Sequence, residues 1–170
     1  MDVRTETLDV ERLFPVRQVL SADGQLLEPL PDFLAPQQLK DVYRHMVYLR
    51  VFDQRCLNLQ RQGRIGTFAP FSGQEASQVG SAYLLRPDRD WIFPTYRDHG
   101  AMHVMGVPFV NILRYFMGDE KGSRAPDGVN AFPISIPIAT QLLHAVGAAW
   151  AAKIRGEDTV AVGYAEIGRA

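Results

Sequence analysis

The feature that most restricts how this chain can fold is a long helical stretch from Pro36 to about Gln62. Proline suits a first helical position, where its missing N–H would have been unpaired, and Gly63 stands where a C-terminal cap belongs. A broad apolar face recurs with helical spacing, formed by Leu39, Val42, Tyr43, Met46, Val47, Leu49, Phe52, Cys56, Leu57 and Leu59. So wide an apolar face on so long a helix requires cover from other elements or from another subunit.

Downstream of this stretch, helical segments alternate with short apolar strands. This alternation predicts an α/β fold with a parallel sheet flanked by helices. Residues 118–131 have turn composition throughout, and an ordered loop of this length is more often functional than idle. We expect helices over 74–85, over a short stretch after residue 100, from Pro108 to Met117, and through about Ile154 with Gly156 as its end, and strands over 90–93 and 159–162.

The chain divides into three parts by its pattern. Residues 1–35 are punctuated by proline and glycine and predict an extended N-terminal lead-in, with a possible short strand over 16–20. Residues 36–164 carry the α/β pattern and form one domain. Residues 165–170 form an aberrant tail, because Glu166 to Ala170 can be encoded by a nucleotide stretch that contains the start of a common sequencing adapter.

Composition narrows the classes of function. The chain is 46% hydrophobic and 22% charged with a net charge of −1, which is an ordinary globular balance without a basic field for nucleic acid. No apolar run reaches the roughly 18 residues that a membrane span needs. The single cysteine, Cys56, cannot form an internal disulfide, so we expect a buried structural thiol and a cytoplasmic protein.

The loop that follows the strand over 90–93 contains Tyr96, Arg97 and His99. Ligands of open parallel sheets bind beyond the carboxyl ends of the strands. The planar guanidinium of Arg97 can bind phosphate with two N–H groups, and a histidine such as His99 can exchange protons near neutral pH. The same residues would also suit a solvated surface loop.

Two further segments carry unusual residues. Residues 66–75 mix small residues, which let the backbone approach a ligand, with Phe68 and Phe71; they also suit a plain helix start with two aromatic core residues. In residues 132–141, Pro137 keeps the chain extended and leaves carbonyl groups available to a ligand or cation. That segment also suits a simple junction between loop and helix.

Taken in order, three stretches carry a resemblance to a known family: GRIGTFAPFSGQEASQVGSAYLL, DWIFPTYRDHG and AFPISIPIATQLLHAVGAAWAAKIRG. The chain resembles, over about residues 35–164, the α subunit of the E1 component of 2-oxoacid dehydrogenase complexes. The resemblance implies a thiamine-diphosphate-binding fold, here truncated after its early strands. It also implies an α2β2 heterotetramer with the E1 β subunit, and acyl transfer to the lipoamide of an E2 acyltransferase.

The resemblance also assigns roles to residues. Tyr96 and Arg97 resemble the pair that contacts the cofactor diphosphate and lines the active site, and Phe68 resembles an aromatic residue at the substrate pocket. Ile136 and Ile138 resemble positions that hold the cofactor in its bent shape. With His99, which was singled out above for its titration near neutral pH, the expected catalytic residues are Phe68, Tyr96 and His99. The stretch that resembles a potassium site in branched-chain members comprises Ser135, Pro137, Thr140 and Gln141.

The pattern departs from the family near the end of the chain. Family members continue the strand after residue 159 into Gly-Asp-Gly, whose Asp, with a later Asn, holds the magnesium ion of the cofactor. The present sequence has no such motif, so we expect the magnesium ligands to be missing and the fragment alone to be inactive.

Three hypotheses compete at this stage. The first is an E1 α subunit fragment, an acyl-transferring oxidoreductase. Pyruvate is slightly favoured, because residues 118–131 are short, and branched-chain 2-oxoacids are a close second because of the IPIATQ and AVGAAWAAK runs. The second is a truncated, non-catalytic subunit-interaction module of the same fold. The third is an unrelated soluble α/β domain.

Overall fold

The computed structural model describes residue 15 and residues 18–165, and the chain forms two units, Met1–Gln38 and Leu39–Ala170. In the first unit, Leu20 and Leu26 form an isolated antiparallel bridge across the turn at Ser21. The strand expected over 16–20 lies partly outside the described residues. So do residues 166–170 of the expected tail.

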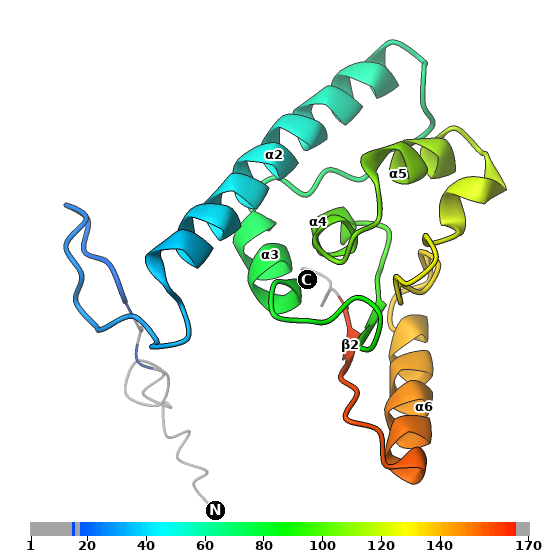
Figure 1. The fold of residues 1–170 in the computed structure, drawn as a ribbon. Helices are drawn as coiled ribbons and strands as arrows, with labels where there is room; N and C mark the ends of the chain where they lie inside the picture. The colour runs from blue at the N-terminus through cyan, green and yellow to red at the C-terminus, as the bar shows by residue number, and fades with distance from the viewer. Residues whose placement is uncertain (1–14, 16–17, 166–170) are drawn as a thin grey trace, which may run out of the picture. The chain divides into compact units, whose positions relative to one another are not determined.

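The element order follows the expected alternation of helices and strands (Figure 1). The elements are α2 (Pro36–Arg61), α3 (Glu75–Ala82), β1 (Trp91–Phe93), α4 (His99–Val104), α5 (Phe109–Phe116), the 3-10 helix η1 (Glu120–Ser123), α6 (Thr140–Arg155) and β2 (Ala161–Gly163). The α/β class with a small parallel sheet flanked by helices is confirmed.

Glycine and proline set the helix ends as the sequence indicates. Gly63 and Gly156 adopt left-handed φ angles of 69° and 68°, and the N–H of Gly156 donates to the carbonyl of Lys153 at 3.2 Å. Pro108 occupies the N-cap of α5 in an extended conformation.

Two expectations were wrong in detail. Helix α3 ends at Ala82 rather than Leu85, because the chain turns there and Leu85 N–H donates to the Ala82 carbonyl. The stretch 118–131 is not a loop throughout, because η1 forms inside it where the Asp119 side chain accepts from Lys121 N–H at 3.0 Å.

Strand β1 is the centre of the small sheet. It pairs in parallel with β2, with Ile92 opposite Val162. On its other side it meets the extended segment 130–135, where Phe132 N–H donates to the Ile92 carbonyl at 2.8 Å. The buried carboxylate of Asp90 fixes the start of both strands, because it accepts from the Val160 N–H and from the Arg86 side chain. These contacts hold the pKa of Asp90 far below its ordinary value.

Helices cover both faces of this sheet. Ile92 and Val162 belong to the core formed with α2, α3, α4 and α5. On the opposite face Phe93 contacts Phe132, which stacks on His144 of α6 at 4.8 Å between ring centroids. The sheet is therefore a thin layer between α6 and the other helices, as the ribbon shows (Figure 1).

The sulfur of Cys56 is part of this core. The residue is fully buried, and burial raises the pKa of its thiol to about 12. The expectation of a buried structural thiol is confirmed, because such a group stays protonated and unreactive. Among the described helices, none combines the length and the apolar character that crossing a membrane requires.

Candidate functional site

The three sequence segments singled out above meet at the carboxyl ends of β1 and β2. The Ser135 N–H donates to the Pro94 carbonyl at 3.3 Å, and Thr95 and Ser135 form a parallel bridge. The Nε of Arg97 donates to the Pro70 carbonyl at 3.0 Å. Segments separated by up to about 70 positions thus become neighbours at the edge where parallel sheets bind ligands.

The loop after β1 is held by hydrogen bonds from within this chain. The Asp98 carboxylate accepts from both the backbone N–H and the hydroxyl of Thr95, at 2.7 and 2.5 Å. The same Thr95 hydroxyl accepts from the Arg97 N–H at 3.3 Å. Because Thr95 and Asp98 are buried, these bonds are shielded from water and fix the loop backbone.

Tyr96 and Arg97 present their side chains at the rim of this loop. Both are half-buried, and the Arg97 guanidinium lies over the Tyr96 ring, 5.2 Å from its centroid. A guanidinium beside an aromatic face and a phenol hydroxyl offers several N–H and O–H donors in one place. This donor set fits an anionic group such as a diphosphate.

Side chains of α2 hold residues 66–75 in place. The buried Asp53 carboxylate accepts from the Phe71 N–H at 2.9 Å and from the Ser72 hydroxyl at 2.6 Å. Where α3 begins, Glu75 forms an ion pair with Arg50, and this hydrogen-bonded pairing lowers the pKa of Glu75 below its ordinary value. These contacts hold the loop backbone beside Arg97, although several of its residues are exposed.

Phe68 and His99 do not face the loop surface. Phe68 is 3% exposed and stacks on the His99 ring with centroids 5.5 Å apart. His99 is fully buried among Phe68, Phe71 and Phe116, and neither ring nitrogen has a hydrogen-bond partner. Burial, with a smaller contribution from the charge of Arg97, lowers the pKa of His99 to about 3.

This packing bears on the catalytic role expected for His99, which stays a prediction. A ring that stays neutral near pH 7 and has no donor or acceptor within reach does not exchange protons with a substrate there. In this arrangement His99 acts as a neutral aromatic member of the core. Phe68 likewise supports the loop from inside, and its expected place at a substrate pocket stays a prediction.

The segment before α6 is more exposed. Ile136 and Ile138 are 56% and 52% exposed, and Ala139 has a left-handed φ of 69°, the only positive φ among described residues other than glycine. That conformation costs a non-glycine residue roughly 1–2 kcal/mol. Ile136 and Ile138 are exposed, whereas Phe68 is buried. The backbones of the loops are therefore close together, but their apolar side chains lie in different surroundings.

Gln141 differs from its neighbours because its side chain is fully buried. Its Nε2 donates to the Tyr164 carbonyl just after β2, but its Oε1 has no partner. Nearby, the Ser135 hydroxyl donates to the Pro137 carbonyl at 3.4 Å, whereas Pro137 and Thr140 are exposed. A buried carbonyl oxygen without a partner is the kind of ligand that a hard cation such as potassium accepts.

Sequence reasoning missed the residues that hold these loops in place. Asp53, Gln78 and Asp98 are buried polar residues whose partners lie on the loops. Asp53 alone had a signal, since it is a carboxylate on the apolar face of a long helix, where a charge requires partners.

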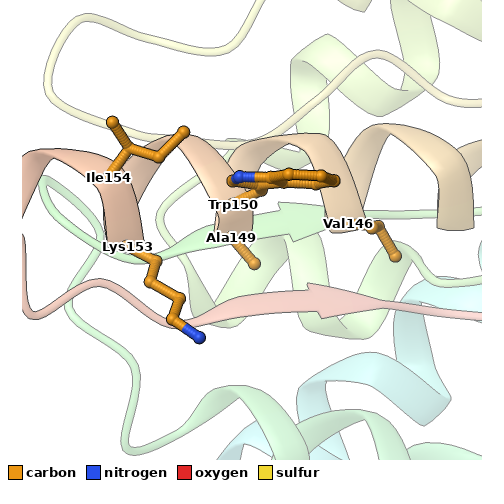
Figure 2. A pocket seen from close by; sticks show the side chains of 5 residues that line it. All are labelled: Val146, Ala149, Trp150, Lys153 and Ile154. Carbon is orange, nitrogen blue, oxygen red and sulfur yellow. The ribbon is translucent and has the colours of Figure 1, made fainter.

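Helix α6 carries an apolar stripe on its outer side. Val146, Trp150 and Ile154 are 63%, 66% and 75% exposed, and they line a hollow of about 680 Å³ together with Ala149 and Lys153 (Figure 2). The stripe lies opposite the side of α6 that contacts the sheet through Ala145 and Ala152, which are buried. A helix with apolar residues on two opposite sides is typical of a helix covered on both.

Comparison with known proteins shows which family the chain belongs to. The family model described as "Dehydrogenase E1 component" matches residues 43–166, which include all three loops. The chain belongs to the dehydrogenase E1 component family. The resemblance inferred from the three sequence stretches is therefore confirmed.

The curated relatives of this E1 chain carry the same family name. It is 40% identical over 157 residues to the "Pyruvate dehydrogenase E1 component subunit alpha" of Staphylococcus aureus (strain Mu50 / ATCC 700699). It is 38% identical over 157 residues to the protein of that name from Staphylococcus epidermidis (strain ATCC 12228 / FDA PCI 1200). Each alignment covers 92% of this chain and 42% of the relative, so the chain spans less than half the length of these proteins.

Proposed function

We propose that this chain is part of the α subunit of a 2-oxoacid dehydrogenase E1 component, which decarboxylates a 2-oxoacid oxidatively and transfers the acyl group to lipoamide on E2. The observation that carries the proposal is the half-buried Tyr96–Arg97 pair on a loop that is fixed at the carboxyl end of β1. The likeness to the staphylococcal pyruvate dehydrogenase subunits supports pyruvate as the substrate. Branched-chain 2-oxoacids are the second candidate, favoured by the IPIATQ run.

Thiamine diphosphate is the proposed cofactor, with a magnesium ion as the family implies. When bound, thiamine diphosphate supplies the stabilised carbanion that decarboxylation requires. In this chain, Arg97 and Tyr96 would bind the diphosphate. Ile136 and Ile138, which have exposed apolar side chains on the neighbouring segment, would contact its apolar part and keep water away.

A potassium ion is the proposed occupant of the segment before α6. The unpaired Oε1 of buried Gln141 would bind it, together with oxygens of Ser135, Pro137 and Thr140 on the same segment. Its role would be structural, because the ion would tie the start of α6 to the exit of β2, where Gln141 already contacts the Tyr164 carbonyl.

The proposed partners are an E1 β subunit, in an α2β2 assembly, and an E2 lipoyl acyltransferase. The exposed apolar stripe on α6 supports a further polypeptide against this chain (Figure 2). A cytoplasmic location is also part of the proposal, because a lone buried thiol suits a reducing compartment.

The same stripe favours the alternative function, a non-catalytic subunit-interaction module that keeps the docking surface of the fold. The two functions differ in whether the protein binds the cofactor. An interaction module would bind a partner subunit with the α6 stripe but would not bind thiamine diphosphate.

Calorimetric titration with thiamine diphosphate and Mg²⁺ tests the proposal, using the full-length subunit that carries this chain, assembled with its partner subunit. We expect saturable binding that weakens about 100-fold in Arg97→Ala, because charge-assisted hydrogen bonds to phosphate are lost. The exposed Arg124→Ala serves as the matched control, and it should bind like the wild type. Absence of binding in the wild type would leave the interaction module as the better account.

A further inference from the structure

Gln78 on α3 is a buried polar residue to which the proposed cofactor site assigns no role. It is 2% exposed, and both the nitrogen and the oxygen of its side-chain amide form hydrogen bonds. The Nε2 donates to the Arg97 carbonyl at 3.0 Å and to the Gln74 Oε1 at 3.2 Å, while the Oε1 accepts from the Gly100 N–H at 2.8 Å. One side chain thus bonds the backbone of the loop at two points three residues apart.

The close contact depends on a glycine. A Cβ at position 100 would lie 2.6 Å from the Gln78 Oε1 and 2.8 Å from the Leu49 Cδ1, both on buried side chains. Only glycine lets the loop backbone approach α3 closely enough for the amide to reach it. We call the Gln78 side-chain amide, with its two bonds to the Gly100 N–H and the Arg97 carbonyl, the amide clamp.

The amide clamp also helps to fix the backbone at Arg97. The Arg97 N–H donates to the Thr95 hydroxyl, and the Arg97 carbonyl accepts from Gln78. With both backbone polar groups bonded to buried side chains, the direction in which the Arg97 side chain leaves the backbone is set. Without Gln78, the Arg97 carbonyl would lose this bond.

We propose that Gln78 is a positioning residue for anion binding: it orients Arg97 through the backbone and thereby sets the affinity of the loop for a diphosphate. This inference rests on the proposed function, because it assigns the diphosphate to Arg97. Preorganised donors bind a charged group more tightly because no ordering cost is incurred at the moment of binding. Gln78 itself does not touch the ligand.

Two variants separate the two bonds of the clamp. Gln78→Met keeps the length of the side chain and removes both bonds. Gln78→Glu keeps an acceptor for Gly100 but removes the donor to the Arg97 carbonyl. Ser77→Ala is the matched control on the same helix, because that exposed hydroxyl donates to the Gln74 carbonyl at the N-cap of α3.

Affinity for thiamine diphosphate with Mg²⁺ is measured by calorimetry in the assembled enzyme. We expect a loss of about tenfold for Gln78→Met and Gln78→Glu and none for Ser77→Ala. In an Arg97→Ala background, Gln78→Met should cause no further loss, because Gln78 acts through Arg97. An equal loss in both backgrounds would show a general structural role and overturn the proposal.

Amide hydrogen exchange of the protein without cofactor gives an independent readout. The Gly100 amide should exchange faster in Gln78→Met and remain protected in Gln78→Glu. If the wild type bound no thiamine diphosphate, the proposed function would fail while this exchange pattern would still report the clamp. Equal Gly100 protection in Gln78→Met and the wild type would show that the clamp does not hold the loop, and would refute the inference. If Gln78→Met does not fold, Gln78→Glu decides by its affinity.

Discussion

Two segments of the candidate site, the loop 94–100 and the segment 135–141, are built in opposite ways. In the loop, Thr95, Asp98 and Gln78 satisfy the backbone with buried hydrogen bonds. In the segment, Ala139 is in a costly left-handed conformation and the Gln141 Oε1 lacks a partner. The backbone of the first is held by buried side chains of this chain, although the His99 ring nitrogens have no partner, whereas the second has the features of a surface that a ligand or another polypeptide completes.

This contrast bears on how the site would assemble. A loop that is already fixed binds an anion without a large ordering cost. A segment with exposed isoleucines and an unpaired acceptor gains more from its ligand, since binding supplies the missing contacts. The two halves should therefore respond differently to mutation, pH and cations.

The largest effect is expected from Gly100→Ala. The added Cβ would press on Gln78 and Leu49, so we expect a loss of about 2 to 3 kcal/mol in the free energy of unfolding, from overpacking and a broken clamp. Gly80→Ala on α3 is the control: no atom lies within 4 Å of its added Cβ, and helix propensity predicts a gain of up to about 1 kcal/mol. Urea denaturation measures both, and equal stability of Gly100→Ala and the wild type would contradict the fixed loop.

Next in size is the dependence of stability on pH through His99. Its folded-state pKa of about 3 lies below the ordinary 6.5, so between these values the unfolded chain binds a proton that the folded chain does not. Stability is full above pH 6.5 and falls by about 2 kcal/mol as pH drops from 6.5 to 4.5.

Denaturation at several pH values compares the wild type with His99→Phe, which keeps an aromatic ring and removes the titrating group. In the variant, the free energy of unfolding should no longer contain the part of its pH dependence that His99 contributes. His103, whose pKa burial also lowers, retains its own share in both proteins. Identical slopes would mean that His99 is not buried as a neutral ring.

A smaller effect concerns the segment 135–141 and cations. Potassium should raise the unfolding free energy by about 1 kcal/mol relative to sodium at equal ionic strength, because it binds only the folded site. In Gln141→Leu the difference should vanish, since the buried oxygen is gone. Thermal unfolding in the two salts measures this, and a wild type indifferent to the cation would rule out the ion.

The smallest effect is expected from Ala139→Gly. Glycine adopts a φ of 69° without strain, so we expect a gain of about 0.5 kcal/mol after its own entropic cost. Ala149→Gly, on the exposed side of α6, should instead cost about 1 kcal/mol. A destabilised Ala139→Gly would indicate that the left-handed turn is not the conformation in solution.

The sequence predicted the elements of the fold better than the packing of the site. Pro36, Gly63, Pro108 and Gly156 marked helix ends because their effect on the backbone is local. The place of the loop 94–100 beyond the end of β1 also followed from the order of the elements. The contacts that bring residues 66–75 and 135–141 to this loop were not predicted.

The orientation of individual side chains could not be predicted in the same way. Phe68 and His99 turned inward because α5 supplies Phe116 across the core, a contact that no local pattern reveals. Gln78 bonds residues about 20 positions away, and hydrophobic periodicity does not show the partners of a buried amide. The physical reason is common to both: these contacts are non-local and polar or aromatic, so only the assembled fold defines them.

The contrast between the two segments is tested most directly by amide hydrogen exchange of the assembled enzyme, with and without thiamine diphosphate and Mg²⁺. We predict that the amides of Thr95, Arg97 and Gly100 are protected before the cofactor is added and change little, while those of residue 136 and residues 138–141 gain protection when it binds. Fast amide exchange at Thr95 and Gly100 in the absence of the cofactor, with protection only after it binds, would contradict the account.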